Sequence, residues 1–450
     1  MSYIAKLGQE FGQYVVQLAG QLFLSHQQPT SLSEMERSIR EMLLKLGQFL
    51  LGAWLAIQES SYLPDSLPCA CGGQARYEFR REGVLHTVLG TITYQRAYYL
   101  CPLCHTGQYP LDERLGLRPG ELSAELESLT AMTGVQLPFA QSSQLFEALT
   151  LLSVSDQSIA KASRAIGEEV ARQEQEWIEQ SRDYAWLQEQ QRLAERPERL
   201  YGALDAVKVH TRGDKEHPWR DLKAGAWFTT TSTPPRTPDE EWEVHATDIT
   251  YYCDVMEAEH FGQLVWATGC QHRAQLAQEL IFLGDGADWI WRLVSNHYPE
   301  AVQIVDWFHA TEYIAPVAQA AFSDDTKANE WIKQVRSDLW DGQLDDVIAA
   351  FERFTNHTRA GEPARKAVTY FTNNRERLRY PEFRAKGYQI GSGTIESGCK
   401  QIATQRLKVA GAIWNLDSCI KTAKARAALL SRQWPIITAR REHLSLPLAA

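Results

Sequence analysis

The stretch LYGALD at residues 200–205 decides the fold class, because a mostly apolar run leads directly into an acid. Such a run is typical of a buried strand, and we expect Asp205 to end it. The pattern recurs twice: LIFLGDG at 280–286 reaches Asp285, and AVQIVD at 301–306 reaches Asp306. A helical pattern over 289–298 separates these two strands, so the sequence predicts a mixed α/β sheet with acids at its strand ends.

The rest of this C-terminal half extends the same sheet. Residues 222–231, 243–254 and 263–268 are predicted to be further strands. Residues 311–384 are rich in charge at helical spacing, which predicts a helical insertion. The motif GSGTIE at 391–396 follows, and we expect Glu396 to open a late helix.

The chain before residue 199 is organised differently. Residues 1–59 have helical periodicity, 65–109 alternate as strands do, and 122–177 are helical again. Within the last of these, 139–170 could form a helix-turn-helix with a break near 153–156. The Glu- and Gln-rich run 172–199 is predicted to be a long exposed connecting helix.

These patterns give a mixed α+β protein with six expected segments. They are an N-terminal helical segment (1–60), a zinc-ribbon-like hairpin module (61–115), a helical DNA-binding or linker region (116–198), the first part of an α/β catalytic core (199–310), a helical insertion (311–385), and the last core helix with a basic C-terminal region (386–450).

Four cysteines form two close pairs, Cys69 with Cys71 and Cys101 with Cys104, on either side of a predicted hairpin. In a cytosolic chain, paired cysteines favour a metal over disulfides. Tetrahedral Zn²⁺ takes four soft ligands, and two short loops at the base of a hairpin deliver two each. We therefore predict a structural Zn²⁺ site, with His86 and His105 as substitute ligands; buried free thiols are the alternative.

The overall charge does not favour DNA binding, since the formal net charge is -10 and phosphate neutralisation needs Lys and Arg. The charge is unevenly distributed, however: residues 400–441 hold many cations and one acid, Asp417. No apolar run is long enough to span a bilayer, and residues 1–9 lack the layout of a secretory signal. We expect a cytoplasmic protein that does not bind membranes.

Three acids occur in the order that two-metal phosphoryl-transfer chemistry requires. Acids at adjacent strand ends converge at one edge of a sheet, so residues distant in sequence can share metal ions. Carboxylate oxygens suit Mg²⁺, and two such ions activate the attacking oxygen and stabilise the departing one. We predict that Asp205, Asp285 and Glu396 are catalytic and hold Mg²⁺ or Mn²⁺.

The motifs LD (204–205), GDGADWI (284–290), DWFH (306–309) and GSGTIES (391–397) resemble, in this order, those of the ISKra family of bacterial insertion-sequence transposases. More distantly they resemble the Mutator-like group. The resemblance covers most of the chain and is strongest over 199–414. It implies an RNase H-like core interrupted by a helical insertion, with an Asp-Asp-Glu triad at Asp205, Asp285 and Glu396.

The resemblance also implies an activity and its partners. Such an enzyme cleaves DNA at the terminal inverted repeats of its element, and the freed 3′-hydroxyl then attacks target DNA. It works as a homo-oligomer in the bacterial cytoplasm, associated with the nucleoid when bound to DNA.

The second acid of the triad has two candidates, because Asp306 also follows a predicted strand. In an RNase H-like order the second acid follows the fourth strand, which favours Asp285. Residues 306–309 then match the Asp/Cys-x-x-His element of the Mutator-like group, in which His309 would orient the scissile phosphate. The alternative for His309 is a hydrogen-bonded histidine beneath the insertion.

The cations expected to contact DNA follow Asp205 or Glu396 closely. Gln405 and Trp414 would add hydrogen bonding and base stacking there; the alternative is a solvated helix face with one buried tryptophan. The predicted DNA-binding residues are Lys208, Arg212, Lys400, Arg406, Lys408, Lys421, Lys424 and Arg426, with His210 as a further phosphate contact.

Two other functions fit the same residues. One is an RNase H-like nuclease or resolvase that hydrolyses DNA but does not join it. The other is a non-catalytic, zinc-containing DNA-binding protein derived from a transposon. The presence of all three acids argues against the second.

Overall fold

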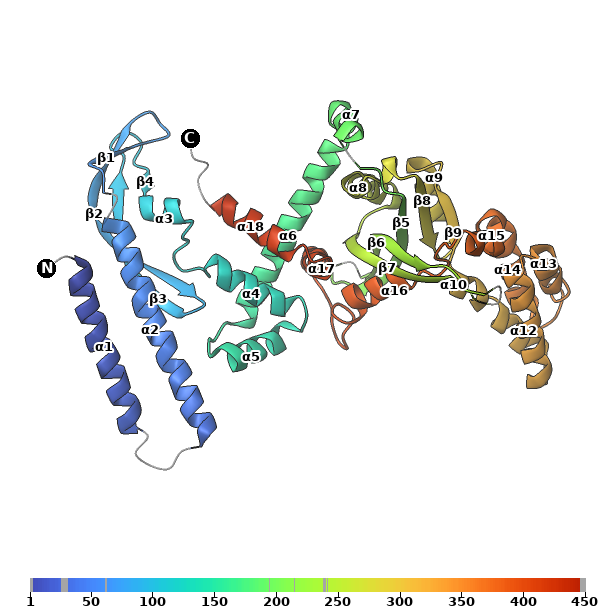
Figure 1. Cartoon of the computed structure of the whole chain (residues 1–450), viewed down its shortest axis with the longest axis horizontal. Helices are drawn as coiled ribbons and strands as arrows, with labels where there is room; N and C mark the ends of the chain where they lie inside the picture. Colours follow the sequence, from blue (N-terminus) through green and yellow to red (C-terminus); the bar gives the residue numbers. More distant parts are fainter. Residues whose placement is uncertain are drawn as a thin grey trace. The chain divides into compact units, whose positions relative to one another are not determined.

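The computed structural model describes residues 3–25, 31–60, 63–193, 195–213, 215–237, 240 and 242–445 (Figure 1). The chain divides into two compact units, the first formed by Met1–Ile166 and Pro435–Ala450 and the second by Gly167–Trp434. Each unit has its own β-sheet. The predicted mixed class with helices and strands is therefore confirmed.

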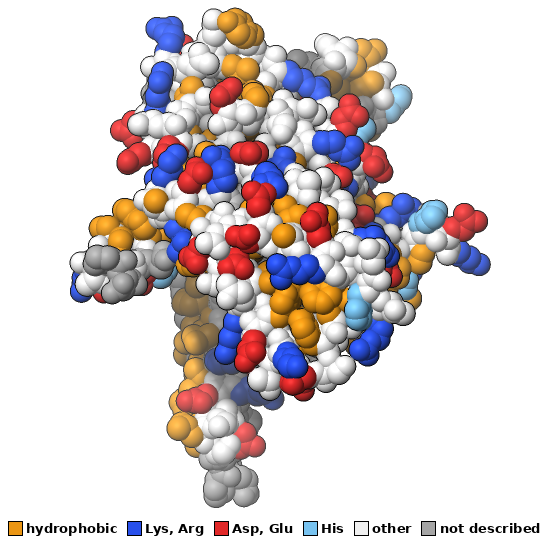
Figure 2. Space-filling model, turned by 90° about the vertical axis from the view of Figure 1, so that its right-hand side faces the viewer, with side chains coloured by type: hydrophobic (Ala, Val, Ile, Leu, Met, Phe, Trp, Pro, Cys, Tyr) orange, Lys and Arg blue, Asp and Glu red, His pale blue; other side chains and the backbone are white. Residues whose placement is uncertain are grey.

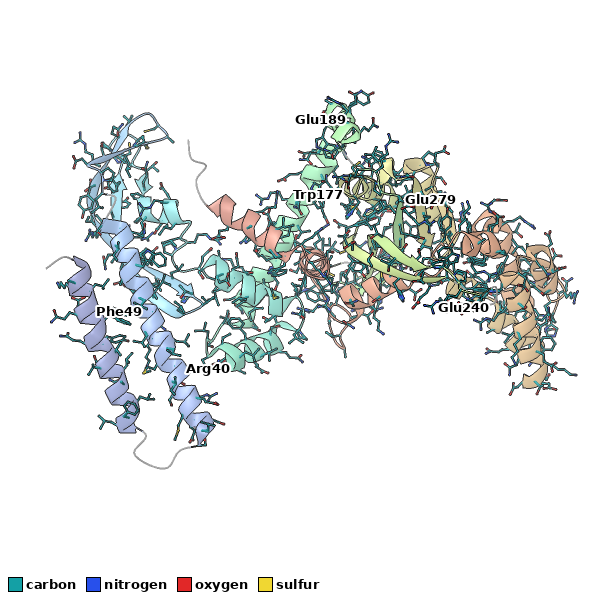
Figure 3. All side chains as sticks on the ribbon, in the orientation of Figure 1. Arg40, Phe49, Trp177, Glu189, Glu240 and Glu279 are labelled. Carbon is teal, nitrogen blue, oxygen red and sulfur yellow. The ribbon has the colours of Figure 1, made fainter. Side chains whose placement is uncertain are left out.

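The first unit begins with two helices, α1 (Tyr3–Ser25) and α2 (Leu32–Ser60), as the periodicity of 1–59 predicts. Phe49 lies on α2 (labelled in Figure 3), and its ring stacks on that of Tyr14 of α1, with the ring centroids 5.2 Å apart. Residues 1–2, 26–30 and 61–62 of the predicted segments lie outside the described residues. Among the described residues, no helix has the length and apolar character that crossing a membrane requires.

A four-stranded antiparallel sheet follows, in the order β1-β2-β3-β4. Its long hairpin turns next to Gly90, whose φ of +110° favours glycine. Leu55 of α2 packs with Leu85 and Ile92 of this hairpin. The strands are β1 (Ser66–Pro68), β2 (Gln74–Thr87), β3 (Gly90–Leu100) and β4 (Gly107–Gln108).

The predicted helix-turn-helix region contains helices with the expected break. Helix α5 (Phe139–Thr150) ends before α6 (Asp156–Gln180), and the Ser155 hydroxyl accepts the N–H of Ser158 at 3.2 Å at the start of α6. Helices α3 (Pro110–Leu115) and α4 (Ala124–Gly134) precede them. The last helix, α18 (Trp434–Ser445), returns to this unit, where Arg441 forms two hydrogen bonds with Glu127, at 2.6 and 2.8 Å.

The second unit is built on a five-stranded sheet in the order β7-β6-β5-β8-β9. β5, β6 and β7 are antiparallel neighbours, whereas β8 and β9 run parallel to β5. The strands are β5 (Arg199–His210), β6 (Trp219–Thr233), β7 (Glu243–Asp254), β8 (Glu279–Gly284) and β9 (Val302–Val305).

Helices cover both faces of this sheet, as the alternation of side chains along β7 shows. Tyr252 stacks on Phe261 of α8 (Ala258–Gln271), while Tyr251 points to the other face and donates to the Thr394 carbonyl of α16 (Gly393–Cys399) at 3.3 Å. The face bearing α8 also carries α9 (Asp288–His297), and that bearing α16 carries α17 (Leu416–Leu430). Short helical turns are η1 (Ala274–Leu276) and η3 (Lys400–Thr404).

The helical insertion leaves the sheet after β9 and returns at residue 386. Its interior is aromatic: Trp331 and Phe371 both lie against Phe351, with ring centroids 5.7 and 5.3 Å away. The predicted helical block is confirmed. It consists of α10 (Trp307–Glu312), α11 (Ile314–Ala321), α12 (Asp325–Trp340), α13 (Leu344–Glu352), α14 (Gly361–Asn373), η2 (Arg375–Arg377) and α15 (Tyr380–Ala385).

Three local predictions are wrong. Residues 263–268 lie in helix α8 rather than in a strand, because a short apolar run fits a buried helix equally well. Asp205 lies within β5 rather than at its end. The run 172–199 contains the end of α6 and a separate helix, α7 (Tyr184–Leu193), and Glu174 within it is buried.

A buried ion cluster explains why part of α6 is not exposed. Lys424 of α17 contacts Glu174 of α6 and lies 2.7 Å from the carboxylate of Asp254 at the end of β7. Its ammonium also donates to the Cys253 carbonyl at 3.0 Å. A buried cation with two acids and a carbonyl is satisfied, whereas the acids without it would not be.

We expect Lys424→Ala to lower the free energy of unfolding by about 3–5 kcal/mol, since it leaves buried Glu174 and partly buried Asp254 without their cation. Lys408→Ala is the matched control, because Lys408 is exposed; it should change the free energy by less than about 0.5 kcal/mol. Urea unfolding of both variants measures the difference. Equal losses for the two variants would contradict a structural role for the buried cluster.

Candidate active site and metal centre

The strand register brings the three predicted aspartates to one row of the sheet. Parallel pairing aligns Ala203 with Leu283, and Leu283 with Ile304. Two residues further along each chain stand Asp205, Asp285 and Asp306. Asp205 remains within β5, whereas Asp285 and Asp306 directly follow the ends of β8 and β9.

Asp205 is a partly buried acid with few polar neighbours. It accepts the N–H of Ala206 at 2.6 Å and hydrogen-bonds with the Cys399 thiol of α16. Burial raises the pKa of the Asp205 carboxyl, and the negative charge of Asp285 raises it further. A cation placed beside this carboxylate would stabilise its charged form.

Asp285 opens onto solvent. Its carboxylate accepts the N–H of Ala287 at 2.9 Å, and its backbone carbonyl accepts the Tyr370 hydroxyl at 2.9 Å. It lines an open pocket of about 520 Å³. The remaining lining residues are His309, Glu312, Tyr313, Pro316, Glu362, Pro363 and Lys366, of which the last three come from α14 of the insertion.

Asp306 is fully buried and holds the start of α10. One carboxylate oxygen accepts the N–H of His309 at 2.7 Å, and the other accepts the N–H of Ser392. Although burial opposes ionisation, the hydrogen bonds from His309 and Ser392 keep the pKa of Asp306 below its usual value. Asp306 is therefore an anion that is already held by the chain itself.

His309 lies between two carboxylates. Its Nδ1 is 3.1 Å from Asp306 Oδ1 and 3.6 Å from Glu396 Oε1, and the Ser392 hydroxyl donates to the same Glu396 oxygen at 2.6 Å. The hydrogen bond with Asp306 raises the pKa of His309 to about 9, against the effect of burial. The ring is therefore an imidazolium at neutral pH.

The structure groups the predicted residues differently from the sequence. In the part of the chain that the structure describes, the four paired cysteines and the set Asp306, His309 and Glu396 each bring their ligand atoms within 4.8 Å of one another. Asp205 and Asp285 lie outside the second group. His309 would have to lose its proton to bind a metal there, so at neutral pH this group is an ion cluster.

Three of the cations predicted to contact DNA are buried, which corrects that prediction for Lys424, Arg406 and Arg426. Lys424 is held by the ion cluster described above, the guanidinium of Arg406 lies 5.0 Å from the Trp414 ring, and Arg426 donates to the Gln401 carbonyl. These side chains cannot reach a phosphate without leaving the core. The sequence could not separate them from exposed cations, because all of them occur in one basic run.

The other predicted cations remain at the surface or near it. Arg212, Lys400 and Lys408 are exposed. Lys208 is exposed and lies 2.8 Å from Asp221, while half-buried Lys421 lies 3.1 Å from Asp417 and 3.6 Å from Glu168. The face shown in Figure 2 carries Lys and Arg interspersed with Asp and Glu rather than a uniform basic surface.

The prediction that Trp414 stacks on a DNA base is also corrected. It is buried, and its Nε1 donates to the Leu407 carbonyl at 2.9 Å. This is the alternative that the sequence left open, a single buried tryptophan. Gln405 is exposed at the surface.

Several residues near the site were not found from the sequence. Cys399 contacts Asp205, Ser392 orients Glu396, and Tyr370 holds the backbone at Asp285. Tyr313 stacks on Tyr370 at 4.0 Å and lines the same pocket. Only Ser392 had a signal in the sequence, because it belongs to the Gly-Ser-Gly turn before Glu396.

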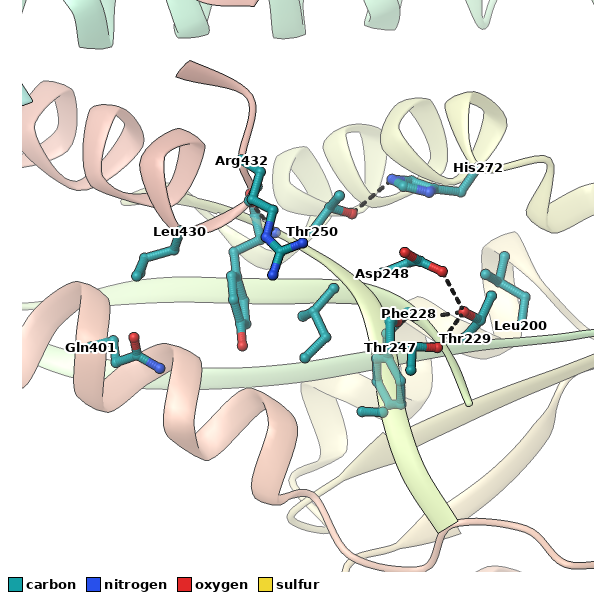
Figure 4. A pocket seen from close by; sticks show the side chains of 14 residues that line it. Leu200, Phe228, Thr229, Thr247, Asp248, Thr250, His272, Gln401, Leu430 and Arg432 are labelled. Atoms are coloured by element: carbon teal, nitrogen blue, oxygen red, sulfur yellow. Dashed lines mark hydrogen bonds between the residues drawn. The ribbon is translucent and has the colours of Figure 1, made fainter. Parts of the chain in front are cut away.

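A second pocket, of about 720 Å³, lies where β7 bulges against β6 (Figure 4). Asp248 and Arg432, which both line it, have φ values of +51° and +57°. His272 meets Thr250 at 2.8 Å there, and burial lowers the pKa of His272 to about 4. None of the predicted site residues lines this pocket.

The four paired cysteines could bind a structural metal such as zinc. Cys69 and Cys104 sulfurs lie 3.5 Å apart, and those of Cys71 and Cys101 lie 3.6 Å apart. Gly73 is needed for space, since a Cβ there would lie 3.1 Å from the Cys101 sulfur. Hydrogen bonds from Thr106 lower the pKa of Cys104 to about 6, which favours the thiolate that metals bind.

The predicted substitute ligands are not part of this cluster. His86 pairs with Thr91 near the turn of the hairpin, and its Nδ1 lies 2.9 Å from that threonine's hydroxyl. His105 has a φ of 57° and follows Cys104 without joining the four sulfurs.

No protein-family model matches this chain, and no curated protein sequence matches it.

We expect the His309 ring to titrate with a pKa of about 9, measurable by the pH dependence of its NMR shifts. Asp306→Asn should bring this pKa back toward the usual histidine value of 6.5. Because the pKa is raised by folding, the stability it contributes is full below pH 6.5 and lost as the pH rises through 9. Unchanged titration in Asp306→Asn would exclude the pair as the cause.

Cys104→Ser is expected to remove bound zinc and to lower the thermal stability of the protein, since a four-sulfur site loses one ligand. His105→Asn is the control, because asparagine tolerates the left-handed backbone and His105 is not a ligand. Metal content of the purified proteins, measured by mass spectrometry, decides the matter. Zinc retained by Cys104→Ser and lost from His105→Asn would reverse the assignment.

Proposed function

We propose that this protein is a DNA transposase of a bacterial insertion sequence, with Asp205, Asp285 and Glu396 as its catalytic acids. The observation that carries the proposal is the register of the sheet: β5 and β8 are parallel and pair as far as Ala203 and Leu283, and Asp205 and Asp285 each stand two residues further on, while α16 carries Glu396. The ordered motifs at 204–205, 284–290, 306–309 and 391–397 support the same assignment.

The sheet order supports an RNase H-like core. Three antiparallel strands in sequence, β5-β6-β7, form one side, and two parallel strands, β8 and β9, extend the other side of β5. The first strand is therefore central and carries the first acid, the fourth strand leads to the second, and a late helix carries the third. The helical insertion falls between β9 and α16, as the resemblance implies.

The residues present fit a divalent metal ion. Burial and the nearby charge of Asp285 raise the pKa of Asp205, so a cation at this position would stabilise the Asp205 carboxylate. Asp205, Asp285 and Glu396 would hold Mg²⁺ or Mn²⁺, which supplies the Lewis acidity for attack on a phosphodiester. Asp306 and His309 position Glu396 and place a positive charge next to the reacting phosphate.

Within this proposal Asp285, and not Asp306, is the second metal ligand. Asp285 faces an open pocket, whereas Asp306 is fully buried and has both oxygens occupied by backbone N–H groups. A DNA strand in the pocket would reach Asp285 without rearranging the chain. Asp306 would have to release α10 or the turn at Ser392.

The remaining parts of the proposal concern partners and location. The protein would bind the terminal inverted repeats of its element and target DNA, as a homo-oligomer that pairs two ends. Zn²⁺ at Cys69, Cys71, Cys101 and Cys104 would be structural. The protein would act in the bacterial cytoplasm on the nucleoid.

We expect Asp205→Asn, Asp285→Asn and Glu396→Gln each to lower the rate of Mg²⁺-dependent cleavage and strand transfer by about a thousandfold or more, since each removes a ligand charge. The measurement uses purified protein with duplexes carrying the ends of its element. Glu330→Gln, at an exposed acid of α12 that does not line the pocket, controls for loss of a carboxylate charge and should reduce the rate far less.

The choice between the two aspartates is tested separately. Asp285→Cys should lose activity with Mg²⁺ and regain part of it with Mn²⁺, because a thiolate is a better ligand for the softer ion. Asp306→Cys should not be rescued, since its loss disturbs the position of Glu396. Rescue of Asp306→Cys alone would make Asp306 the ligand, and wild-type rates for Glu396→Gln would refute the site.

A further inference from the structure

The hairpin of β5 and β6 extends beyond the rest of the sheet at the catalytic edge. Pairing between β5 and β6 continues to His210 and Trp219, while β5 pairs with β8 only as far as Ala203 and Leu283. The hairpin therefore runs about 17 Å past Asp205, at about 3.4 Å per residue. We call residues 206–222 the finger.

The end of the finger carries an exposed aromatic pair. Trp219 is 51% exposed, and its ring stacks on that of His210 at 4.8 Å with an interplanar angle of 22°. The other large aromatic side chains of β6, Trp227 and Phe228, are buried. Exposure of a tryptophan leaves a flat apolar face in water, which costs free energy unless another flat group covers it.

The sequence of the finger has only a small excess of positive charge. It holds four cations, Lys208, Arg212, Lys215 and Arg220, and three acids, Asp214, Glu216 and Asp221. Arg212 and Lys215 are exposed, whereas Lys208 already pairs with Asp221 at 2.8 Å. This contrasts with the net charge of -10 for the whole chain.

The finger is fixed to the segment that follows Glu396. Arg212 N donates to the Trp414 carbonyl at 2.8 Å, and Trp414 N donates to the His210 carbonyl at 3.0 Å. These two backbone hydrogen bonds hold the residues on either side of Thr211 against the segment at Trp414. A rigid platform loses little conformational entropy when a ligand binds it.

We propose that the finger binds unpaired nucleotides of the DNA substrate, with a base stacked on the exposed face of Trp219 and the neighbouring phosphates on Arg212 and Lys215. This inference rests on the proposed function and adds to it a preference for single-stranded or frayed DNA at the catalytic edge. Aromatic stacking with flanking cations is the chemistry by which proteins hold single strands. A base inside a duplex is already stacked on both faces and cannot stack on Trp219.

The experiment measures binding of a fluorescein-labelled DNA strand, alone and in a blunt duplex, by anisotropy in EDTA. Wild-type protein should bind the strand more tightly. Trp219→Ala should weaken binding of the strand by about five- to one-hundredfold, while changing duplex binding little. Trp219→Phe should retain most of the affinity, and Trp54→Ala is the control, since Trp54 is 65% exposed on α2.

A second measurement protects against variants that fold poorly. A strand containing 5-iodouracil is cross-linked by light to the wild-type protein, and the modified peptide should contain Trp219. Equal binding by Trp219→Ala and wild type, equal losses for strand and duplex, or cross-links only outside the finger would each overturn the proposal.

The results of these experiments distinguish a failure of the finger proposal from a failure of the transposase proposal. Strand binding through Trp219 without cleavage in Mg²⁺ would overturn the transposase and leave the finger in place. Cleavage and joining with strand binding that does not depend on Trp219 would do the reverse.

Discussion

The arrangement of the candidate site depends on one buried carboxylate, that of Asp306. It accepts the N–H of His309 at the start of the insertion and the N–H of Ser392 at its end, so a single side chain joins two segments 86 residues apart. The Trp307 N–H donates to the Ile390 carbonyl beside it at 3.0 Å. Without these bonds, the insertion could return to the sheet at another position, and Glu396 would not be placed near the strand ends.

The charges of the site divide into two kinds. Asp306 and His309 satisfy each other, which lowers one pKa and raises the other, and their pair needs nothing further. Asp205 accepts one backbone N–H and contacts the Cys399 thiol, and burial and the charge of Asp285 raise its pKa. Among the residues that the structure describes, no cationic side chain forms a hydrogen bond or an ion pair with Asp205. A perturbed acid of this kind is a candidate for a functional role, whereas a fully hydrogen-bonded acid fits a structural one.

Three cations of the C-terminal region, Lys424, Arg406 and Arg426, interact inside the protein rather than at its surface. Lys424 neutralises Glu174 and Asp254, and Arg406 lies against the buried Trp414. Glu174 is likewise buried, although the composition of the acidic run around it predicted an exposed helix. Charged residues that pair across elements cannot be distinguished by sequence from those that meet water, because the partners of Lys424 lie about 170 to 250 residues away.

The sequence by itself determined the strands around Asp205, Asp285 and Asp306, the helical insertion and the cysteine hairpin, because each rests on local periodicity or close spacing. It misplaced the strand at 263–268, where a short apolar run has no periodicity to decide it. Only the tertiary structure decided that Asp306 is buried and Asp285 open, that Lys424 is internal and that Trp219 is exposed on the finger. Burial and ion pairing depend on which distant segments come into contact, and strand register and helix packing determine those contacts.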